Sequence, residues 1–434
     1  MSGAKISGVK GMNDLLPPQI ETWQRIEGVA RALFGRYGFS EIRTPIVEHT
    51  ELFVRSVGEV TEIVGKEMYT FTDKGDRSIT MRPEGTAPAA RAYIEHGIAN
   101  TEPLTRWFYM GPMFRYERMK TGRYRQFYQL GAEAYGSVDP AQDVEVIALC
   151  AEFFKQIGVP DVVLHLNSLG DGSTRPAYLE ALRAHFAPLV GQMSDEAKVA
   201  YERNTMRLLD SKEAALQEAI AAAPAILDSI DEGSKQHFAT VRRMLEKLGI
   251  AYEIDRRLVR GLDYYTRTTF EFIYQPKGEN ALGTAGTVCG GGRYDRLVHE
   301  LGGPEKPAVG FAMGLDRLVM LLESVKGTTR AAPTLFVGTF DGPERDDAIA
   351  LVMALRNEGF HVDFDPRGGK LGKQKERASK VNAAWFASYG DAEHKSRTLK
   401  IDNMRLPKDA PKEQVEVSLD GLRAWLNEQV KRAS

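Results

Sequence analysis

The sequence is poor in cysteine and lacks long apolar runs. Its 434 residues include two cysteines, Cys150 and Cys289, which form no Cys-x-x-Cys pair. This excludes a disulfide scaffold or a thiolate zinc site and is typical of a reducing compartment. The opening MSGAKISGVKGMNDLLPP has no apolar core of signal-peptide length, and no later run of about 18 apolar residues predicts a membrane span. We therefore expect a cytoplasmic protein without a membrane partner.

An excess of charge of one sign is also missing. The chain has 57 Lys and Arg against 59 Asp and Glu, a formal net charge of −2. Binding to nucleic acid would therefore require local basic patches. Hydrophobic residues make up 43% and charged residues 27%, as in soluble globular proteins, and the length suggests two or three domains with buried cores.

Four segments are predicted from the patterns of apolar residues. Residues 1–171 alternate helical and strand patterns, whereas 172–249 have helical patterns only, with Ala-rich faces. Strand patterns return in 250–327. Residues 331–434 alternate strands and helices, which predicts a small α/β module. The region rich in polar motifs is thus predicted to be one domain interrupted by a helical insertion.

The stretch FRYERMKTGRYRQFYQLGAE, residues 114–133, predicts two antiparallel strands joined by MKTGR. Because side chains alternate between faces, its charges are sorted. The packing face is predicted to carry Phe114, Tyr116, Tyr124, Tyr128, Leu130 and Ala132. The polar face is predicted to carry Arg115, Glu117, Arg123, Arg125, Phe127, Gln129, Gly131 and Glu133.

That polar face has the properties of a ligand site. Gly131 leaves space for a small ligand between Gln129 and Glu133, and Phe127 offers a flat surface to a planar base. The arginines suit a phosphate or carboxylate because each guanidinium offers paired donors. The alternative is an exposed sheet with structural ion pairs.

Two further segments place polar residues next to the end or the beginning of a predicted strand. In RPEGT, Glu84 and Thr86 open a helix and could bind an ammonium group; the alternative is a helix N-cap made by Thr86. In LVRGLDYYTRTTFE, Arg260 beside a glycine could project into a cleft, and Tyr264 and Tyr265 could line a pocket. The alternative there is a strand pair with aromatic packing.

Two glycine-containing segments follow. In TVCGGGRYD the glycines permit close backbone approach to a ligand, but they match neither GxGxxG nor the P-loop, so nucleotide binding would use another fold. In VGFAMGLDR, small residues give a strand one bare face, and Arg317 could hold a phosphate. The alternative is tight packing of a helix on a strand, with an ion pair.

Together these segments resemble the three motifs of class II aminoacyl-tRNA synthetases. YGFSEIRTPIV is similar to the first motif, FRYE with Arg123 and Phe127 to the second, and GFAMGLDR to the third, with Asp316 where the class has Glu. More specifically, RPEGT, FRYER–GRYRQFYQLG, LVRGLDYYTRTTFE and GGRYD occur in the order typical of the histidyl-tRNA synthetase family, and the likeness runs from Val9 to Glu323.

The resemblance implies a fold and a set of partners. The expected fold is an α+β catalytic domain built on an antiparallel sheet, with a helical insertion and a C-terminal α/β anticodon-binding domain. The first motif implies a homodimer. The implied reaction activates L-histidine with ATP as histidyl-adenylate and transfers it to the 3′ end of tRNA(His), with Mg²⁺ bridging the outer phosphates and no dedicated protein metal site.

The resemblance also implies roles for individual residues. Arg115 and Arg260 would be catalytic at the α-phosphate. The residues implied to bind ATP are Arg115, Glu117, Arg123, Phe127 and Arg317. Those implied to bind histidine are Glu84, Thr86, Gln129, Glu133, Tyr264, Tyr265 and Tyr294.

Two alternatives to an active ligase are weighed. One is a non-catalytic histidine-binding paralogue like the regulatory subunit of ATP phosphoribosyltransferase. Such paralogues tend to lose catalytic arginines and the C-terminal domain, whereas Arg115, Arg260, Arg317 and a C-terminal module are present here. The other, a pure RNA-binding protein, would leave the polar face unexplained.

A basic segment in the C-terminal module is the expected site of tRNA contact. It contains Arg367, Lys370, Lys373, Lys375 and Arg377, with only Glu376 opposing them locally. Such a cluster can contact phosphates in a chain that is otherwise near neutral. The alternative is a solvated helix face.

Overall fold

The computed structural model describes most of the chain, and it divides into two compact units, residues 1–329 and 330–434. The described residues are 6–58, 61, 63–171, 174–259, 264–278, 281–282, 286–327, 332–406, 411 and 413–433. Within these ranges, no helix has the length and apolar character needed to cross a membrane.

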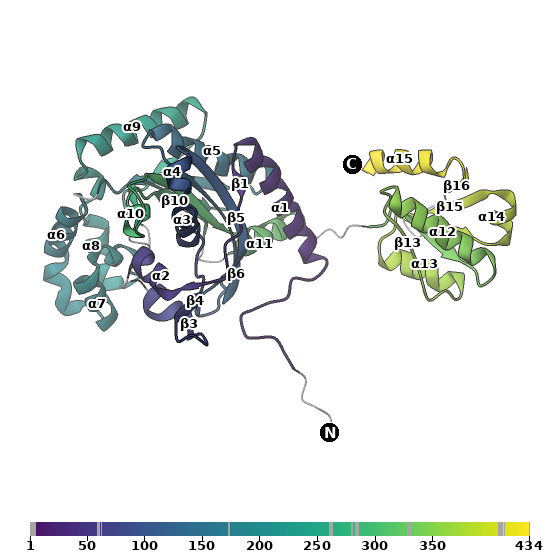
Figure 1. The fold of residues 1–434 in the computed structure, drawn as a ribbon, viewed down its shortest axis with the longest axis horizontal. Coiled ribbons are helices and arrows are strands. Elements are labelled where there is room, and N and C mark those ends of the chain that lie inside the picture. Colours follow the sequence, from purple (N-terminus) through teal and green to yellow (C-terminus); the bar gives the residue numbers. More distant parts are fainter. Residues whose placement is uncertain are drawn as a thin grey trace, which may run out of the picture. The chain divides into compact units, whose positions relative to one another are not determined.

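An eight-stranded sheet forms the centre of the first unit (Figure 1). Its strands, in spatial order, are β1 (Ser40–Glu41), β5 (Thr105–Phe114), β6 (Gln126–Tyr135), β11 (Ala308–Gly314), β10 (Thr287–Arg293), β9 (Thr266–Tyr274), β7 (Val162–Ser168) and β8 (Glu253–Ile254). The strands from β5 to β7 all pair antiparallel, and only the two short edge strands pair parallel. This confirms the predicted antiparallel sheet.

Four helices cover one face of this sheet: α1 (Gln19–Arg36), α5 (Pro140–Ile157), α9 (Glu232–Lys247) and α11 (Leu315–Lys326). The strands contribute alternate residues to this core, such as Phe108, Leu130 and Ala132. Tyr109 and Glu133 therefore point to the opposite face. The alternation predicted for Gln129 to Glu133 is confirmed, and so is the packing side of Tyr128, whose ring contacts Trp23.

Shorter elements surround the other face. A three-stranded sheet consists of β2 (Val47–His49), β4 (Ser78–Met81) and β3 (Tyr69–Thr72). The helices here are α2 (Thr50–Val57), the π-helical turn Ile63–Glu67, α3 (Thr86–Glu95), α4 (Ile98–Thr101) and α10 (Leu297–Glu300).

The helical segment that interrupts the sheet consists of short pieces, as its composition predicts. They are α6 (Thr174–Phe186), η2 (Ala187–Gln192), α7 (Asp195–Arg203), η3 (Thr205–Asp210), η4 (Ala214–Leu216), α8 (Gln217–Ala222), η5 (Ile226–Asp228) and α9. The pieces before α9 bury Tyr178, Leu182 and Phe186 in a second core, which they share with α3, α10 and the tyrosines Tyr264 and Tyr294. Helix α9 instead packs against α5 and buries Phe238 and Val241 in the main core.

The prediction that FRYER and the start of GRYRQ are strands is wrong. β5 ends at Phe114, and β6 begins only at Gln126. Between them the chain makes a separate turn, and the guanidinium of Arg125 lies 3.8 Å from the centre of the Tyr116 ring. The alternation of a strand predicts opposite faces for these two residues. The cause lies far away in sequence, because the carbonyl of Gly11 accepts hydrogen bonds from the amides of Arg125 (2.8 Å) and Gln126 (3.1 Å).

The second unit has a five-stranded sheet with helices packed on it. In spatial order its strands are β13 (Val362–Phe364), β12 (Leu335–Thr339), β14 (Trp385–Tyr389), β15 (Thr398–Asn403) and β16 (Gln414–Ser418). Its helices are α12 (Glu344–Asn357), α13 (Leu371–Lys380), α14 (Asp391–Ser396) and α15 (Leu422–Ala433). The predicted alternation is confirmed, except that α14 was not predicted.

Candidate active site

A buried carboxylate lies at the centre of the sheet face that the helices leave uncovered. Glu133 on β6 is fully buried, and its two oxygens accept hydrogen bonds from the hydroxyl groups of Tyr109 (2.9 Å) and Tyr294. Burial raises the pKa of Glu133 to about 8, although hydrogen bonds from Tyr294, Thr86 and Tyr109 act in the opposite direction. At neutral pH the free protein therefore holds Glu133 largely in its protonated form.

A protein side chain occupies the space beside Glu133 that the sequence predicts to be open for a ligand. The sequence predicts room for a ligand at Gly131, but a Cβ there would overlap the ring of Tyr109, which occupies that space. Gly310 on β11 has a similar role, because a Cβ there would overlap the Glu133 carboxylate and lie 2.8 Å from the Tyr294 hydroxyl. These glycines make room for the side chains that hold the carboxylate.

Tyr109 belongs to this site although the sequence motifs do not single it out. It lies on β5 directly opposite Gly131 of β6. An aromatic residue across from a glycine is a recognisable signal, but only once the register of the two strands is known.

The RPEGT segment places two polar side chains next to this carboxylate. Glu84 accepts hydrogen bonds from the backbone amides of Thr86 (2.6 Å) and Ala87 (2.8 Å), so Glu84 caps helix α3, not Thr86 as the capping alternative assumed. Burial raises the pKa of Glu84, although these amides and the charge of Arg115 lower it. The Thr86 hydroxyl is left to interact with Glu133, Tyr109 and Tyr264.

Gln129 carries a buried acceptor that no described residue satisfies. It lies on β6 between Gly111 of β5 and Gly314 of β11. Its side-chain oxygen is buried without a hydrogen-bond partner among the residues that the structure describes. Buried polar atoms are almost always paired in folded proteins, so this oxygen is available to a donor on a ligand.

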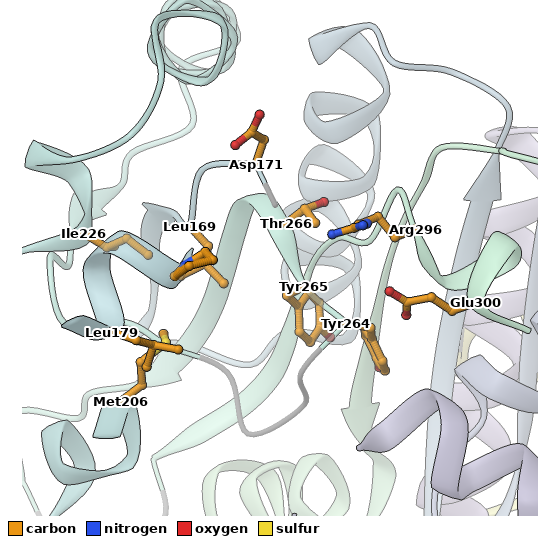
Figure 2. A pocket seen from close by; sticks show the side chains of 11 residues that line it. Leu169, Asp171, Leu179, Met206, Ile226, Tyr264, Tyr265, Thr266, Arg296 and Glu300 are labelled. Carbon is orange, nitrogen blue, oxygen red and sulfur yellow. The ribbon is translucent and has the colours of Figure 1, made fainter. Parts of the chain in front are cut away.

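Three tyrosines lie close together near Glu133. The ring centres of Tyr264 and Tyr265 are 4.7 Å apart, and those of Tyr264 and Tyr294 are 5.4 Å apart. Figure 2 shows Tyr264 and Tyr265 projecting into a cavity of about 260 Å³. The cavity is lined by Leu169, Asp171, Pro176, Leu179, Met206, Ile226, Tyr264, Tyr265, Thr266, Arg296 and Glu300.

Positive charge gathers at the other end of β6. Arg115 donates to the Pro83 carbonyl (2.8 Å), and its guanidinium lies 5.2 Å from the centre of the Phe127 ring. Arg317 donates to the carbonyls of Gly122 (3.2 Å) and Thr287 (2.5 Å). Burial, together with the charges of Arg123 and Arg115, lowers the pKa of Arg317. Arginines that destabilise one another's charge in this way form a site that favours a polyanion.

Two carboxylates accompany these arginines. Glu117 pairs with Arg123 at 2.9 Å, so this predicted ATP ligand is engaged by an arginine that is also a predicted ATP ligand. Glu271 on β9, which the sequence reasoning did not select, accepts from the Thr287 hydroxyl at 2.9 Å and acts electrostatically on Arg317. Within the described ranges, no cluster of three or more His, Cys, Asp or Glu side chains could hold a metal ion.

One predicted catalytic residue, Arg260, lies outside the described residues, as do its neighbours 261–263. The other predicted residues of the first unit belong to two adjoining groups on one sheet face. The carboxylate group contains Glu84, Thr86, Gln129, Glu133, Tyr264, Tyr265 and Tyr294. The arginine group contains Arg115, Glu117, Arg123, Phe127 and Arg317.

The basic segment of the second unit is less free than its sequence suggests. Arg367 pairs with Asp365 (2.7 Å), Lys375 with Asp402 (2.5 Å), and Arg377 lies 3.9 Å from Asp365. The acidic partners Asp365 and Asp402 lie outside the basic helix. Counting only Glu376 within the segment therefore underestimates the negative charge close to it. Two lysines of the segment, Lys370 and Lys373, are exposed and belong to no ion pair in the described part of this unit.

A largely antiparallel sheet that carries a group of arginines beside a group of buried carboxylates and tyrosines is the architecture of the catalytic domain of a class II aminoacyl-tRNA synthetase. The family model for histidyl-tRNA synthetase matches residues 11–318, and that for an anticodon binding domain matches residues 339–429. The chain belongs to the histidyl-tRNA synthetase family.

Curated relatives agree over nearly the whole chain. A histidine–tRNA ligase from Anaeromyxobacter dehalogenans is 46% identical over 408 residues, covering 94% of this chain and 97% of the relative. One from Syntrophotalea carbinolica is 43% identical over 426 residues, covering 98% and 99%. The crystal structure of apo S. aureus histidyl-tRNA synthetase is similar with a TM-score of 0.79 and 35% identity, covering 97% of this chain and 100% of that one.

A structure that bears on the paralogue alternative is more distant. A protein from Bacillus halodurans C, described as an ATP phosphoribosyltransferase regulatory subunit/histidyl-tRNA synthetase, is 23% identical with a TM-score of 0.63. At this identity the likeness shows the fold alone. The higher identity to curated ligases favours the ligase over the regulatory paralogue.

Proposed function

We propose that this chain couples ATP cleavage to the attachment of L-histidine to tRNA(His), by way of histidyl-adenylate. The observation that carries the proposal is the adjacency of two complementary groups of side chains at the two ends of β6. One is built around the protonatable Glu133 and the unsatisfied Gln129 oxygen, and the other around a cluster of arginines. Activation of an amino acid requires both sites, with the reacting carboxylate and phosphate brought together between them.

The first site would hold histidine. The α-ammonium group would donate hydrogen bonds to the Gln129 side-chain oxygen and to the buried side chains of Glu84 and Thr86. The imidazole would lie against Tyr264, Tyr265 and Tyr294, with one ring nitrogen paired to Glu133. A pocket whose buried polar groups match a ligand's donors and acceptors rejects analogues that leave one unpaired, by roughly 10⁴-fold or more.

The second site would hold ATP as its magnesium complex. Phe127 would stack on adenine with Arg317 on the far side, Arg123 would contact the outer phosphates, and Glu117 would orient the base or the metal. Glu117 and Glu271 are carboxylates that act electrostatically on Arg317. A magnesium ion usually keeps several water ligands and is bound by one or two carboxylates together with the substrate phosphates. The ion would therefore enter with the nucleotide.

The chemistry then needs positioning and positive charge rather than a covalent nucleophile. A carboxylate oxygen of histidine attacks the α-phosphorus in line, the bond to the β-phosphate oxygen breaks, and pyrophosphate leaves. Arg115 and Arg260 neutralise the charge that develops on the α-phosphate. A ribose hydroxyl at the tRNA 3′ end then attacks the adenylate carbonyl, which releases AMP.

The remaining assignments follow from the same reaction. The second unit would bind the tRNA anticodon arm through Arg367, Lys370, Lys373, Lys375 and Arg377, and the protein would act in the cytoplasm. We also propose a homodimer, because the first motif carries the exposed apolar side chains Ile46 (44% exposed) and Val47 (37%). Phe71, on β3 of the same small sheet as Val47, is 47% exposed. Sedimentation as a monomer at micromolar concentration would contradict the dimer.

Histidine-dependent exchange of pyrophosphate into ATP, measured without tRNA, tests the central proposal. We expect exchange with histidine and not with other amino acids, and loss of exchange in Gln129→Leu, which removes the unsatisfied acceptor. A matched control is Gln156→Leu on the surface of α5. Binding of histidine without exchange would instead support the regulatory paralogue.

A further inference from the structure

A fully buried ion pair lies directly behind the carboxylate site. Arg293 ends β10, one residue before Tyr294, and neither Arg293 nor Asp143 of α5 exposes any surface. The Arg293 Nε lies 3.1 and 3.2 Å from the two carboxylate oxygens of Asp143, and Nη2 donates to the same group. Arg293 also donates to the Ser137 carbonyl (2.8 Å) in the connection between β6 and α5.

A histidine from the helical segment completes this group. His237 of α9 is buried, and its Nε2 lies 3.2 Å from Asp143 Oδ1. Burial alone would raise the pKa of Asp143, but the hydrogen bond from His237 and the charge of Arg293 outweigh it, so its pKa lies below the ordinary value. Asp143 therefore stays charged and holds both partners.

Stability alone is a weak reason for such an arrangement. Removing a paired arginine and aspartate from water has a desolvation cost that their mutual attraction often fails to offset. Well-packed apolar side chains can therefore replace such pairs without loss of stability. What the pair supplies is a defined position for the end of β10. The next residue along the chain is Tyr294, whose hydroxyl donates to Glu133.

We propose that His237, Asp143 and Arg293 act as positioning residues for histidine recognition. His237 orients the Asp143 carboxylate, Asp143 orients Arg293, and Arg293 fixes Tyr294 so that its hydroxyl meets Glu133. The helix α9, at the end of the helical segment, is thereby coupled to the imidazole site. The inference rests on the proposed function, because it assigns the effect to that site. Binding groups must be held to within about 0.5 Å by their supporting contacts, so a loosened support weakens recognition.

The test uses the full-length protein with His237→Leu, which removes the donor, and His237→Gln, whose amide nitrogen can restore it. In pyrophosphate exchange, we expect His237→Leu to raise KM for histidine roughly tenfold, equivalent to about 1.4 kcal/mol at 25 °C, with KM for ATP unchanged. The Gln variant should return KM for histidine most of the way to the value of the unmodified protein. His185→Leu is the matched control, because His185 in the same segment donates to the Ala219 carbonyl (2.8 Å) and makes no hydrogen bond to His237, Asp143 or Arg293 among the described residues.

A double-mutant cycle tests the route through the tyrosine. If His237 acts through Tyr294, His237→Leu should add little to the effect of Tyr294→Phe on KM for histidine, whereas full additivity would refute the route. Equal rises in both KM values, or a lower melting temperature with both KM values unchanged, would show a merely structural role. Absence of exchange in the unmodified protein would instead refute the proposed function, and histidine binding measured by calorimetry on the same variants would still test the positioning.

Discussion

Replacement of Glu133 by glutamine tests the central electrostatic feature of the site. Burial raises the pKa of Glu133 from the ordinary 4.5 to about 8. Below pH 4.5 the folded and unfolded chains both hold this proton, so it has no effect on stability. Between pH 4.5 and 8 only the folded chain retains it. The free energy of unfolding therefore falls as pH rises through this window, and above pH 8 the loss is complete.

The magnitude follows from the linkage relation. At pH 7 the unfolded chain has lost the proton by a margin of about 2.5 pH units, and each unit corresponds to about 1.36 kcal/mol, so holding Glu133 protonated costs about 3 kcal/mol. Glutamine has the shape of the protonated acid and does not titrate. Its NH₂ end requires one tyrosine hydroxyl to accept instead of donate, which a hydroxyl can do. We expect Glu133→Gln to be more stable than the unmodified protein by about 3 kcal/mol at pH 7.

The assay is urea unfolding of both proteins from pH 5 to pH 8.5 without histidine. The difference between their free energies of unfolding should grow with pH and level off near pH 8, because titrating groups that do not interact with Glu133 contribute equally to both proteins. A difference that stays constant over this range would refute the reasoning. The variant should also lose histidine-dependent exchange, since glutamine cannot give up a proton to become an anionic partner for the imidazole.

Three other changes have clear expected outcomes. Gly310→Ala should abolish histidine-dependent exchange, because the added Cβ overlaps the buried carboxylate, whereas Gly191→Ala, which meets open space, should not; retained activity in the first would contradict the packing. Replacing Lys370 and Lys373 together by alanine should reduce the salt dependence of tRNA binding by a slope of about 0.7 to 0.9 per lysine, and an unchanged slope would remove them from the interface. A chain ending at Gly327 should keep exchange in the same assay but charge tRNA poorly, and unimpaired charging would exclude the second unit as the anticodon reader.

Local sequence patterns predicted the elements that depend on local contacts. The alternation in β6, the helices of the interrupting segment and the order of strands and helices in the second unit followed from periodicity. The FRYER stretch has the same alternation, yet it forms no strand after Phe114, because the amides of Arg125 and Gln126 donate to the distant Gly11 carbonyl. A contact with so distant a residue leaves no trace in the local pattern.

The same limit applies to the candidate site. The residues selected from motifs lie in two adjoining groups, because the motifs end strands that the sheet brings together. The residues that hold those groups in place were not selected. Tyr109 reads as an ordinary strand residue until it is placed opposite Gly131, and Arg293, Asp143 and His237 come from three elements whose packing no single stretch encodes.

The order of strands in the large sheet has a consequence for the synthesis of the chain. β6 carries Phe127, Gln129 and Glu133 of the candidate site, but its neighbour β11 is made only after the helical segment and strands β7 to β10 have emerged. Until then one edge of β6 has unpaired backbone groups, which in a nascent protein invite pairing with other chains. Ribosome-bound chains that end before β11 therefore expose an unpaired edge of β6, which can pair with other chains. We expect this edge to need protection during translation until β11 has been made.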